Sequence, residues 1–98
     1  MVLWLTVIKT REIRANLLSK GFQVEESHHE FLWFYFNGKR TRIKTRLSHG
    51  KKEYSPGLIS AMKKQLILKS QKEIEDLLNC PMSEEQYIEI LLKCGELD

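Results

Sequence analysis

The sequence predicts an α+β fold, a two-layer α-β-β-β-α sandwich whose three-stranded antiparallel sheet has helices on one face. Three features predict it. An aromatic run over residues 28–36 ends at Asn37-Gly38, the favoured two-residue hairpin turn, because both positions accept positive φ. Residues 41–47 then alternate between basic and apolar side chains, as in a strand with one buried face. Apolar residues at helical spacing precede and follow this hairpin.

A first helix is expected over about residues 9–20, before the strands. Gly21 provides its C-terminal stop, because glycine readily adopts the left-handed conformation there. Residues 22–25 form a short expected strand, which makes the sheet three-stranded. Residues 1–7 fit either another short strand or an apolar lead-in to the helix. The apolar stripe of this helix comprises Ile8, Ile13, Ala15, Leu17 and Leu18.

After the hairpin the sequence predicts a polar, basic loop over residues 48–54 and then three helices. Ser55-Pro56 opens the first helix, as N-cap and first helical position. Capping boxes at residues 70–73 and 83–86 open two short acidic helices, of which Gly95 ends the second. We expect residues 1–69 to form one domain and residues 70–98 a helical extension packed on or near it. The buried stripe of the helix after Pro56 comprises Leu58, Ile59, Met62 and Leu66.

The charge is distributed asymmetrically along the chain, although its net value is only +3. Between residues 38 and 72 the only acidic side chain is Glu53, whereas from residue 73 onward the only basic one is Lys93. Such a one-sided basic stretch is typical of a nucleic-acid-binding surface, the alternative being an ordinary solvated face. No apolar run approaches the roughly 20 residues of a membrane span, and no signal-peptide core opens the chain. We therefore expect a cytoplasmic protein whose partner is RNA and not a membrane.

Cys80 and Cys94 are the only cysteines, and they flank the last expected helix. At about 1.5 Å of rise per residue that helix separates its ends by about 15 Å, too far for a disulfide. The chain has no CxxC pair of the kind typical of zinc sites. We expect two reduced cysteines, no metal and no other cofactor.

The turn at Asn37-Gly38 also predicts the register of the hairpin, with Phe36 opposite Lys39 and uninterrupted pairing behind them. One face then points to the core. The other interleaves basic and aromatic side chains, which suits phosphate contacts and base stacking, or equally a purely structural cation–π ladder. The expected inner pairs are Leu32 with Ile43, Phe34 with Thr41 and His28 with Leu47. The expected outer pairs are Trp33 with Arg42, Phe31 with Lys44 and His29 with Arg46.

Ser27-His28-His29 stands where a loop becomes the aromatic strand. An imidazole can accept and donate protons near neutral pH, and cations beside it can hold phosphates. Together these groups suit phosphodiester cleavage without a metal, so His28 and His29 are the candidate catalytic residues. His49 either positions RNA or caps a loop. The candidate RNA-binding residues are Ser27, Trp33, Arg42, Lys44, Arg46, His49, Lys51 and Lys52.

Four short segments follow one another along the chain: Gly21-Phe22, Ser27-His28-His29, Leu47-Ser48-His49-Gly50 and Ser55-Pro56-Gly57-Leu58. In this order they resemble the HicA family of mRNA interferase toxins, whose small fold is like the double-stranded-RNA-binding domain. The resemblance covers about residues 9–68. It implies a metal-independent endoribonuclease of a toxin-antitoxin system, with His28 as the catalytic histidine and a HicB-like antitoxin as partner. Glu26 stands in the glycine position of the family, and Leu47 in its proline position.

Three functions stay open at this point. In the first, a histidine acts as general acid or base on the RNA 2′-hydroxyl; the resemblance favours His28 and the register favours His29. The second is a non-catalytic RNA-binding module of the same fold, which Glu26 in the glycine position favours. The third is a protein-interaction domain whose acidic helices form the contact surface. A further hypothesis is that the acidic C-terminal segment folds onto the basic face and covers it.

Overall fold

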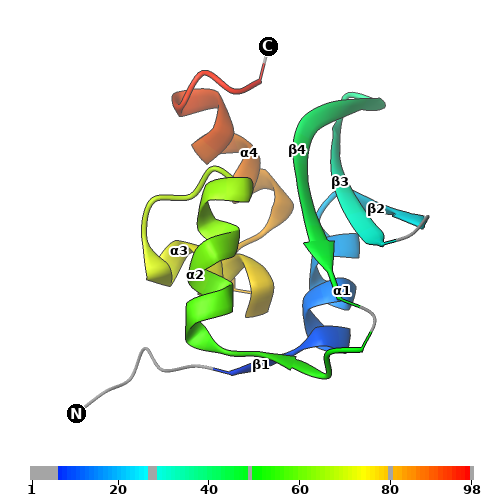
Figure 1. Cartoon of the computed structure of the whole chain (residues 1–98). Coiled ribbons are helices and arrows are strands. Elements are labelled where there is room, and N and C mark those ends of the chain that lie inside the picture. Colours follow the sequence, from blue (N-terminus) through cyan, green and yellow to red (C-terminus); the bar gives the residue numbers. More distant parts are fainter. Residues whose placement is uncertain (1–6, 27–28, 49, 80, 98) are drawn as a thin grey trace.

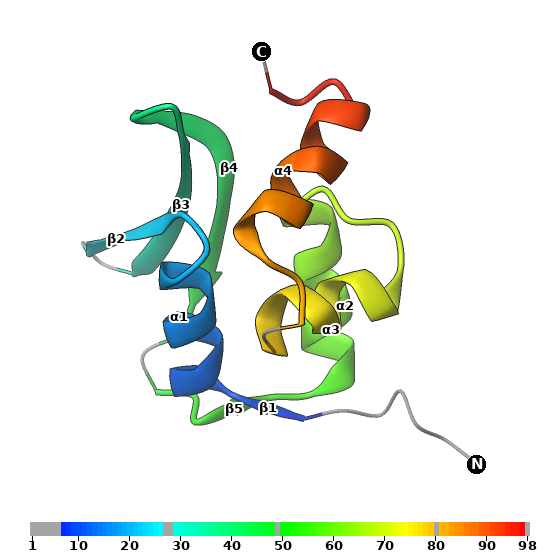
Figure 2. The same cartoon turned by 180° about the vertical axis from the view of Figure 1, so that it is seen from behind.

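The computed structural model describes residues 7–26, 29–48, 50–79 and 81–97. In chain order its elements are β1 (Ile8–Lys9), α1 (Thr10–Leu18), β2 (Phe22–Glu26), β3 (Glu30–Phe36), β4 (Lys39–Leu47), β5 (Glu53–Tyr54), α2 (Pro56–Gln65), α3 (Gln71–Asn79) and α4 (Glu84–Lys93). The strands β2, β3 and β4 form an antiparallel sheet in that order, and the helices pack against it, as Figures 1 and 2 show from opposite sides. The predicted α+β sandwich is confirmed. Within the described ranges, no helix is long and apolar enough to cross a membrane.

A second, two-stranded sheet pairs β1 with β5 at the lower end of the molecule in Figure 1, with Ile8 opposite Tyr54. Thr10 ties the start of α1 to the same segment. Its backbone N donates to Lys52 O over 2.9 Å, and its Oγ1 donates to Lys51 O over 2.7 Å. The prediction of a loop over residues 48–54 was therefore wrong for the last two residues. Strands of two residues are too short to show the alternation that predicts a strand.

The helices begin largely as their capping signals predict. Ser55 and Ser83 accept hydrogen bonds from the first turns of α2 and α4, and the capping box of α4 is complete. The box before α3 is only half formed. The Glu73 backbone N donates to Ser70 Oγ, but the Glu73 carboxylate accepts from Lys69 N.

The predicted apolar stripes are partly wrong, because each helix buries a narrower face than its sequence suggests. On α1 the buried apolar residues are Ile13 and Leu17. Ala15 and Leu18 are exposed, as is Leu58 on α2. Gly21 follows α1 at φ +96°, where an added Cβ would lie 3.0 Å from the Phe34 ring and 2.7 Å from the Glu84 carboxylate. Both its backbone conformation and this close packing require glycine.

The C-terminal helices share one core with the sheet. Ile74, Leu77, Leu78, Tyr87 and Leu91 are fully buried in the same cluster as the apolar residues of α1, α2 and the strands. The last carbonyls of α3 accept hydrogen bonds from α1. Lys20 Nζ donates to Leu77 O over 2.5 Å, and Asn16 Nδ2 donates to Leu78 O over 2.7 Å. The helices α3 and α4 are thus packed onto the rest of the described chain.

The hairpin departs from the predicted register at an irregularity between Trp33 and Tyr35. Over this stretch β4 has two more residues than β3. A shift by two keeps every side chain on its face, so the predicted faces are right and the pairs beyond the irregularity are wrong. The Thr41 hydroxyl replaces ladder hydrogen bonds there, donating to Phe34 O over 2.7 Å and accepting from Ile43 N over 3.1 Å. The observed pairs are Glu30 with Leu47, Phe31 with Arg46, Leu32 with Thr45 and Trp33 with Lys44.

Tyr87 of α4 connects the sheet to the end of α2. Its ring contacts the Phe22 and Phe34 rings, with centroid separations of 5.9 and 5.1 Å. Its hydroxyl donates to Leu66 O over 2.7 Å. Directly after Leu66 the chain turns out of α2 through Ile67 at φ +63°, a conformation that a β-branched residue adopts only at a cost. The hydroxyl therefore satisfies a buried carbonyl beside the most strained described turn.

Arg14 of α1 holds the first residue of β3. Its Nε and Nη2 donate to the two carboxylate oxygens of Glu30 over 2.7 and 2.6 Å. The Glu30 side chain is only 4% exposed, against 33% for Arg14. These hydrogen bonds raise the pKa of Arg14, and burial partly opposes the effect. The pair fixes the end of the sheet where β3 begins.

Substitution Tyr87→Phe should lower the free energy of unfolding by about 1–2 kcal/mol near neutral pH, because Leu66 O loses its buried donor. Burial raises the pKa of Tyr87 above its ordinary value of about 10. The folded state therefore keeps the Tyr87 proton, which the unfolded state releases above about pH 10. Above that pH this group lowers the free energy of unfolding of the wild type by about 1.4 kcal/mol per pH unit. Urea unfolding of both proteins across this range measures the effect. The Phe variant lacks this loss, so equal pH slopes in the two proteins would contradict the assignment.

Substitution Arg14→Ala should cost about 2 kcal/mol of stability, because it leaves the buried Glu30 carboxylate without its bidentate partner. The cost is below that of a fully buried pair, since Arg14 is partly open to water. Arg11→Ala, an exposed arginine on the same helix, is the matched control and should change stability by less than about 0.5 kcal/mol. Chemical denaturation compares the two, and similar losses would show that the pair contributes nothing specific.

Candidate nucleic-acid interface

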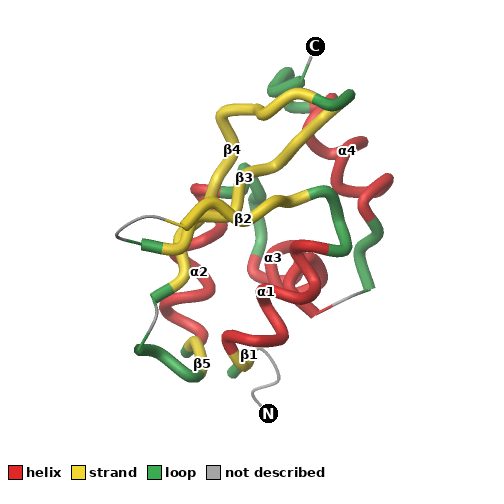
Figure 3. The backbone as a smooth tube through the Cα atoms, turned by 90° about the vertical axis from the view of Figure 1, so that its right-hand side faces the viewer, coloured by secondary structure: helices red, strands yellow, loops and turns green. Residues whose placement is uncertain are grey.

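The outer face of the hairpin is a row of cations lying over aromatic rings. Arg40 Cζ lies 4.2 Å from the Trp33 ring centroid. Lys44 Nζ lies 4.7 Å from the Trp33 ring and 5.0 Å from the Phe31 ring. Figure 3 shows the long β3–β4 hairpin that presents them, extending past the shorter β2. We call this surface the outer basic face, formed by Phe31, Trp33, Arg40, Arg42, Lys44 and Arg46.

Glu25 of β2 fixes one end of this row. Its carboxylate accepts from Trp33 Nε1 over 3.0 Å and from Arg40 Nη1 over 3.3 Å. The Trp33 ring thus has Arg40 and Lys44 within cation–π distance and a hydrogen bond at its edge. The structural cation–π ladder is therefore present. It holds Arg40 and Lys44 against the aromatic rings of β3.

The C-terminal segment reaches the outer basic face at Arg42. Its Nη2 lies 3.4 Å from Glu96 Oε1, yet the Arg42 side chain is 88% exposed. An ion pair this exposed is weak and screened by salt. Beside it an open hollow of about 710 Å³ lies between the hairpin and residues 95–97. Among the described residues, Glu96 makes the only ion pair between the acidic C-terminal segment and this face.

His29 lies immediately before β3, exposed, at the end of the outer basic face. Its ring meets the Phe31 ring edge-on at a centroid distance of 6.3 Å. Lys44 Nζ lies over that same ring. The His29 imidazole and the Lys44 ammonium therefore both contact Phe31. The predicted partner of His29, Arg46, lies opposite Phe31 instead, owing to the irregularity in the hairpin. Ser27, His28 and His49 lie outside the described residues.

The two positions that differ from the HicA pattern have ordinary backbone roles. Glu26 is the last residue of β2 and is exposed; its φ is not positive, so the strand does not need glycine there. Its charge contributes, after that of Glu30, to the raised pKa of Arg14. Leu47 ends β4 fully buried in the core, opposite Glu30.

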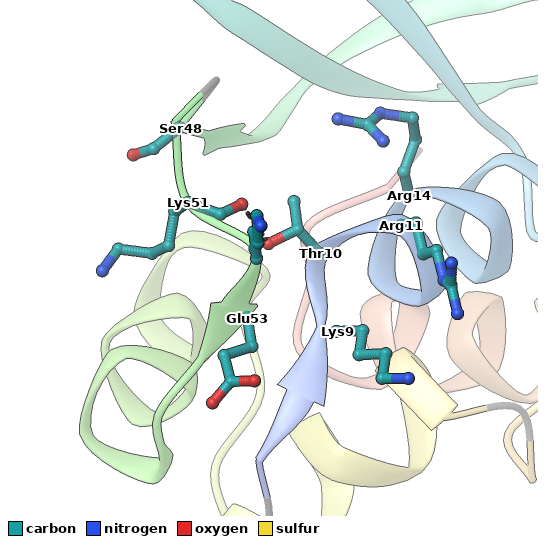
Figure 4. A pocket seen from close by; sticks show the side chains of 8 residues that line it. Lys9, Thr10, Arg11, Arg14, Ser48, Lys51 and Glu53 are labelled. Atoms are coloured by element: carbon teal, nitrogen blue, oxygen red, sulfur yellow. Dashed lines mark hydrogen bonds between the residues drawn. The ribbon is translucent and has the colours of Figure 1, made fainter.

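A second basic surface lies where α1 begins, and Figure 4 shows it from close by. It is an open hollow of about 440 Å³, which we call the basic hollow. Cationic side chains reach its rim from α1 and from the segment before β5, while Glu53 is the one carboxylate that lines it. The hydrogen bonds of Thr10 to residues 51 and 52 hold the two segments together. The lining residues are Lys9, Thr10, Arg11, Arg14, Ser48, Lys51, Lys52 and Glu53.

The predicted site residues therefore divide between two surfaces. Trp33, Arg42, Lys44 and Arg46 lie on the outer basic face, whereas Lys51 and Lys52 line the basic hollow. The sequence did not indicate Arg40 on the first surface, nor the three cations Lys9, Arg11 and Arg14 on the second. No pattern in the sequence indicates that residues 9–14 lie beside residues 48–53, because only the β1–β5 pairing brings them together. In the part of the chain that the structure describes, no group of three or more metal-ligating side chains gathers.

No family model, curated protein or solved structure matches this chain.

Proposed function

We propose that this chain is a metal-independent endoribonuclease, an mRNA interferase that holds RNA along the outer basic face and cuts it with a histidine. The observation that supports it most is the shared contact at Phe31. His29 meets this ring at 6.3 Å and Lys44 at 5.0 Å, with Arg46 opposite on β4. A phosphate bound by Lys44 and Arg46 would lie beside an exposed imidazole. The resemblance to HicA toxins supports the same reaction.

The chemistry needs only these groups. A histidine imidazole, His28 or His29, takes the proton of the RNA 2′-hydroxyl, whose oxygen attacks the adjacent phosphorus. The P–O5′ bond breaks, and the 5′-oxygen leaves with a proton from the second imidazole or from water. The products are a 2′,3′-cyclic phosphate and a 5′-hydroxyl. Lys44 and Arg46 offset the charge that develops on the phosphate oxygens.

A non-catalytic RNA-binding module is the second candidate. The ion pairs of Glu25 with Arg40 and of Glu96 with Arg42 reduce the positive charge of the outer basic face. Glu26 and Glu30 add carboxylates close to Arg14 at the histidine end of the sheet. These nearby carboxylates would weaken RNA binding. Weak binding of this kind suits a module that binds RNA without cleaving it.

As an mRNA interferase the protein would act in the cytoplasm, where a HicB-like antitoxin would neutralise it. An antitoxin that covers the outer basic face should present carboxylates to Lys44 and Arg46, because opposite charges steer and orient such complexes.

Wild-type protein should cleave single-stranded RNA in EDTA and leave a 2′,3′-cyclic phosphate that mass spectrometry of the products detects. Replacing the catalytic histidine by Ala should slow cleavage by about 10²–10⁴-fold, the usual contribution of a general acid or base. His28→Ala and His29→Ala, measured separately, identify which residue it is. Undiminished cleavage by both variants would exclude the histidine mechanism. RNA binding without cleavage by the wild type would favour the second candidate.

The double variant Lys44→Ala/Arg46→Ala should bind RNA more weakly and with a smaller salt dependence. Each lost phosphate contact on a single strand lowers the slope of log K against log salt by about 0.7. Lys64→Ala/Lys69→Ala removes two exposed charges elsewhere and is the matched control. Fluorescence anisotropy over about 50–200 mM salt measures both slopes. Equal slopes in the two double variants would place RNA on another surface.

A further inference from the structure

We infer that the basic hollow is a binding site for a phosphate group, supplied by the RNA strand that the outer basic face holds; the second part rests on the proposed function. Its cations come from two segments far apart in the sequence, Lys9 and Arg11 at the start of α1 and Lys51 and Lys52 before β5. Folding thus brings four exposed positive charges around one hollow of about 440 Å³.

These four cations differ from Arg40 and Arg42 of the outer basic face, which already have carboxylate partners. Among the residues that the structure describes, none of the four has a carboxylate within ion-pair distance, although Glu53 also lines the hollow. Arg40 and Arg42, by contrast, are paired with Glu25 and Glu96. Glu53, opposite Lys9 across the β1–β5 pair, is one negative charge against these four positive ones. A bound phosphate would offset more of the remaining charge.

Arg14 lies between the hollow and the outer basic face, and it is not one of the unpaired cations of either surface. Arg14 lines the hollow, but its Nε and Nη2 are paired with Glu30 at the start of β3. In Figure 4 it points toward the sheet, whereas Lys9 on β1 and Arg11 on α1 extend to the right and Lys51 extends to the left. Arg14 therefore shapes the hollow without supplying it with free charge.

The hollow and the outer basic face meet at one end of the sheet. Ser48, which lines the hollow, directly follows Leu47, and Leu47 lies opposite Glu30, the residue after His29. An RNA strand that passes His29 at the end of β3 therefore reaches the rim of the hollow next. This continuity favours a phosphate of the RNA backbone over a free phosphate as the occupant, and it puts the hollow on the far side of His29 from Lys44.

The variant Lys9→Ala/Arg11→Ala tests the site, because both side chains are exposed and their loss should leave the fold intact. Its salt slope for binding a short single-stranded RNA should fall by about 1.4, two contacts at about 0.7 each. Lys64→Ala/Lys69→Ala, with the same change in charge, should keep the wild-type slope. Amide chemical shifts of residues 9–14 and 50–53, recorded with RNA and separately with inorganic phosphate, locate the contact.

Each outcome decides the inference. A reduced slope for the hollow variant, with RNA-induced shifts in both segments, supports a backbone-phosphate site. Shifts with inorganic phosphate alone, and a slope equal to the control, would reassign the hollow to a free phosphate and overturn its role in RNA binding. Shifts with neither probe would overturn the phosphate site while leaving binding by the outer basic face intact. If the wild type binds no RNA, the proposed function fails, and the inorganic-phosphate spectra still decide whether the hollow holds a phosphate.

Discussion

Burial of the Tyr87 side chain is the constraint on which the arrangement of sheet and helices depends. The ring packs on Phe22 and Phe34 of two neighbouring strands, and the hydroxyl satisfies Leu66 O where the chain leaves α2. A residue of the last helix thus joins the sheet, α2 and α4 in one contact. Burial of its large apolar ring stabilises the fold. Its hydroxyl can be buried without cost only where it finds a hydrogen-bond partner, which here is Leu66 O. The C-terminal helices are consequently part of the core, and α1 reinforces this by capping the last carbonyls of α3 with Lys20 and Asn16.

Local signals in the sequence were sufficient for the elements but not for their contacts. The Asn37-Gly38 turn and the capping residues Ser55 and Ser83 are each determined by the chemistry of a few adjacent residues, and all are found as expected. Gly21 has the expected positive φ, although α1 already ends at Leu18. The pairing beyond Thr41 was not predictable in the same way. Its hydroxyl substitutes for ladder hydrogen bonds, so two extra residues fit into β4 without exposing a polar group. Because two is also the period of a strand, the predicted faces were right although the pairs were wrong.

At the candidate site, too, local features were predictable from the sequence and contacts between distant segments were not. Alternation along β4 predicts which side chains share the outer basic face, since that is a property of one strand. The basic hollow depends on two segments about forty residues apart that meet through β1 and β5, pairings too short to leave a pattern. Glu25, Trp33 and Arg40 likewise meet only because three strands lie side by side. The sequence therefore indicated the cations of β4 and of residues 51–52, but neither those near α1 nor the ion pairs that Arg40 and Arg42 make.

The irregular stretch of β4 has a consequence for solubility. β4 is an edge strand of nine residues, and a long regular edge of this kind is a template on which other chains can add strands and aggregate. The extra residues around Thr41 interrupt the ladder, and the cations of β4 repel a second copy of the same edge. Any partner that neutralises these cations also removes this protection. At high concentration the protein should therefore be least soluble when a partner neutralises only part of the cations of β4. Self-association would begin at the regular segment from Ile43 to Leu47.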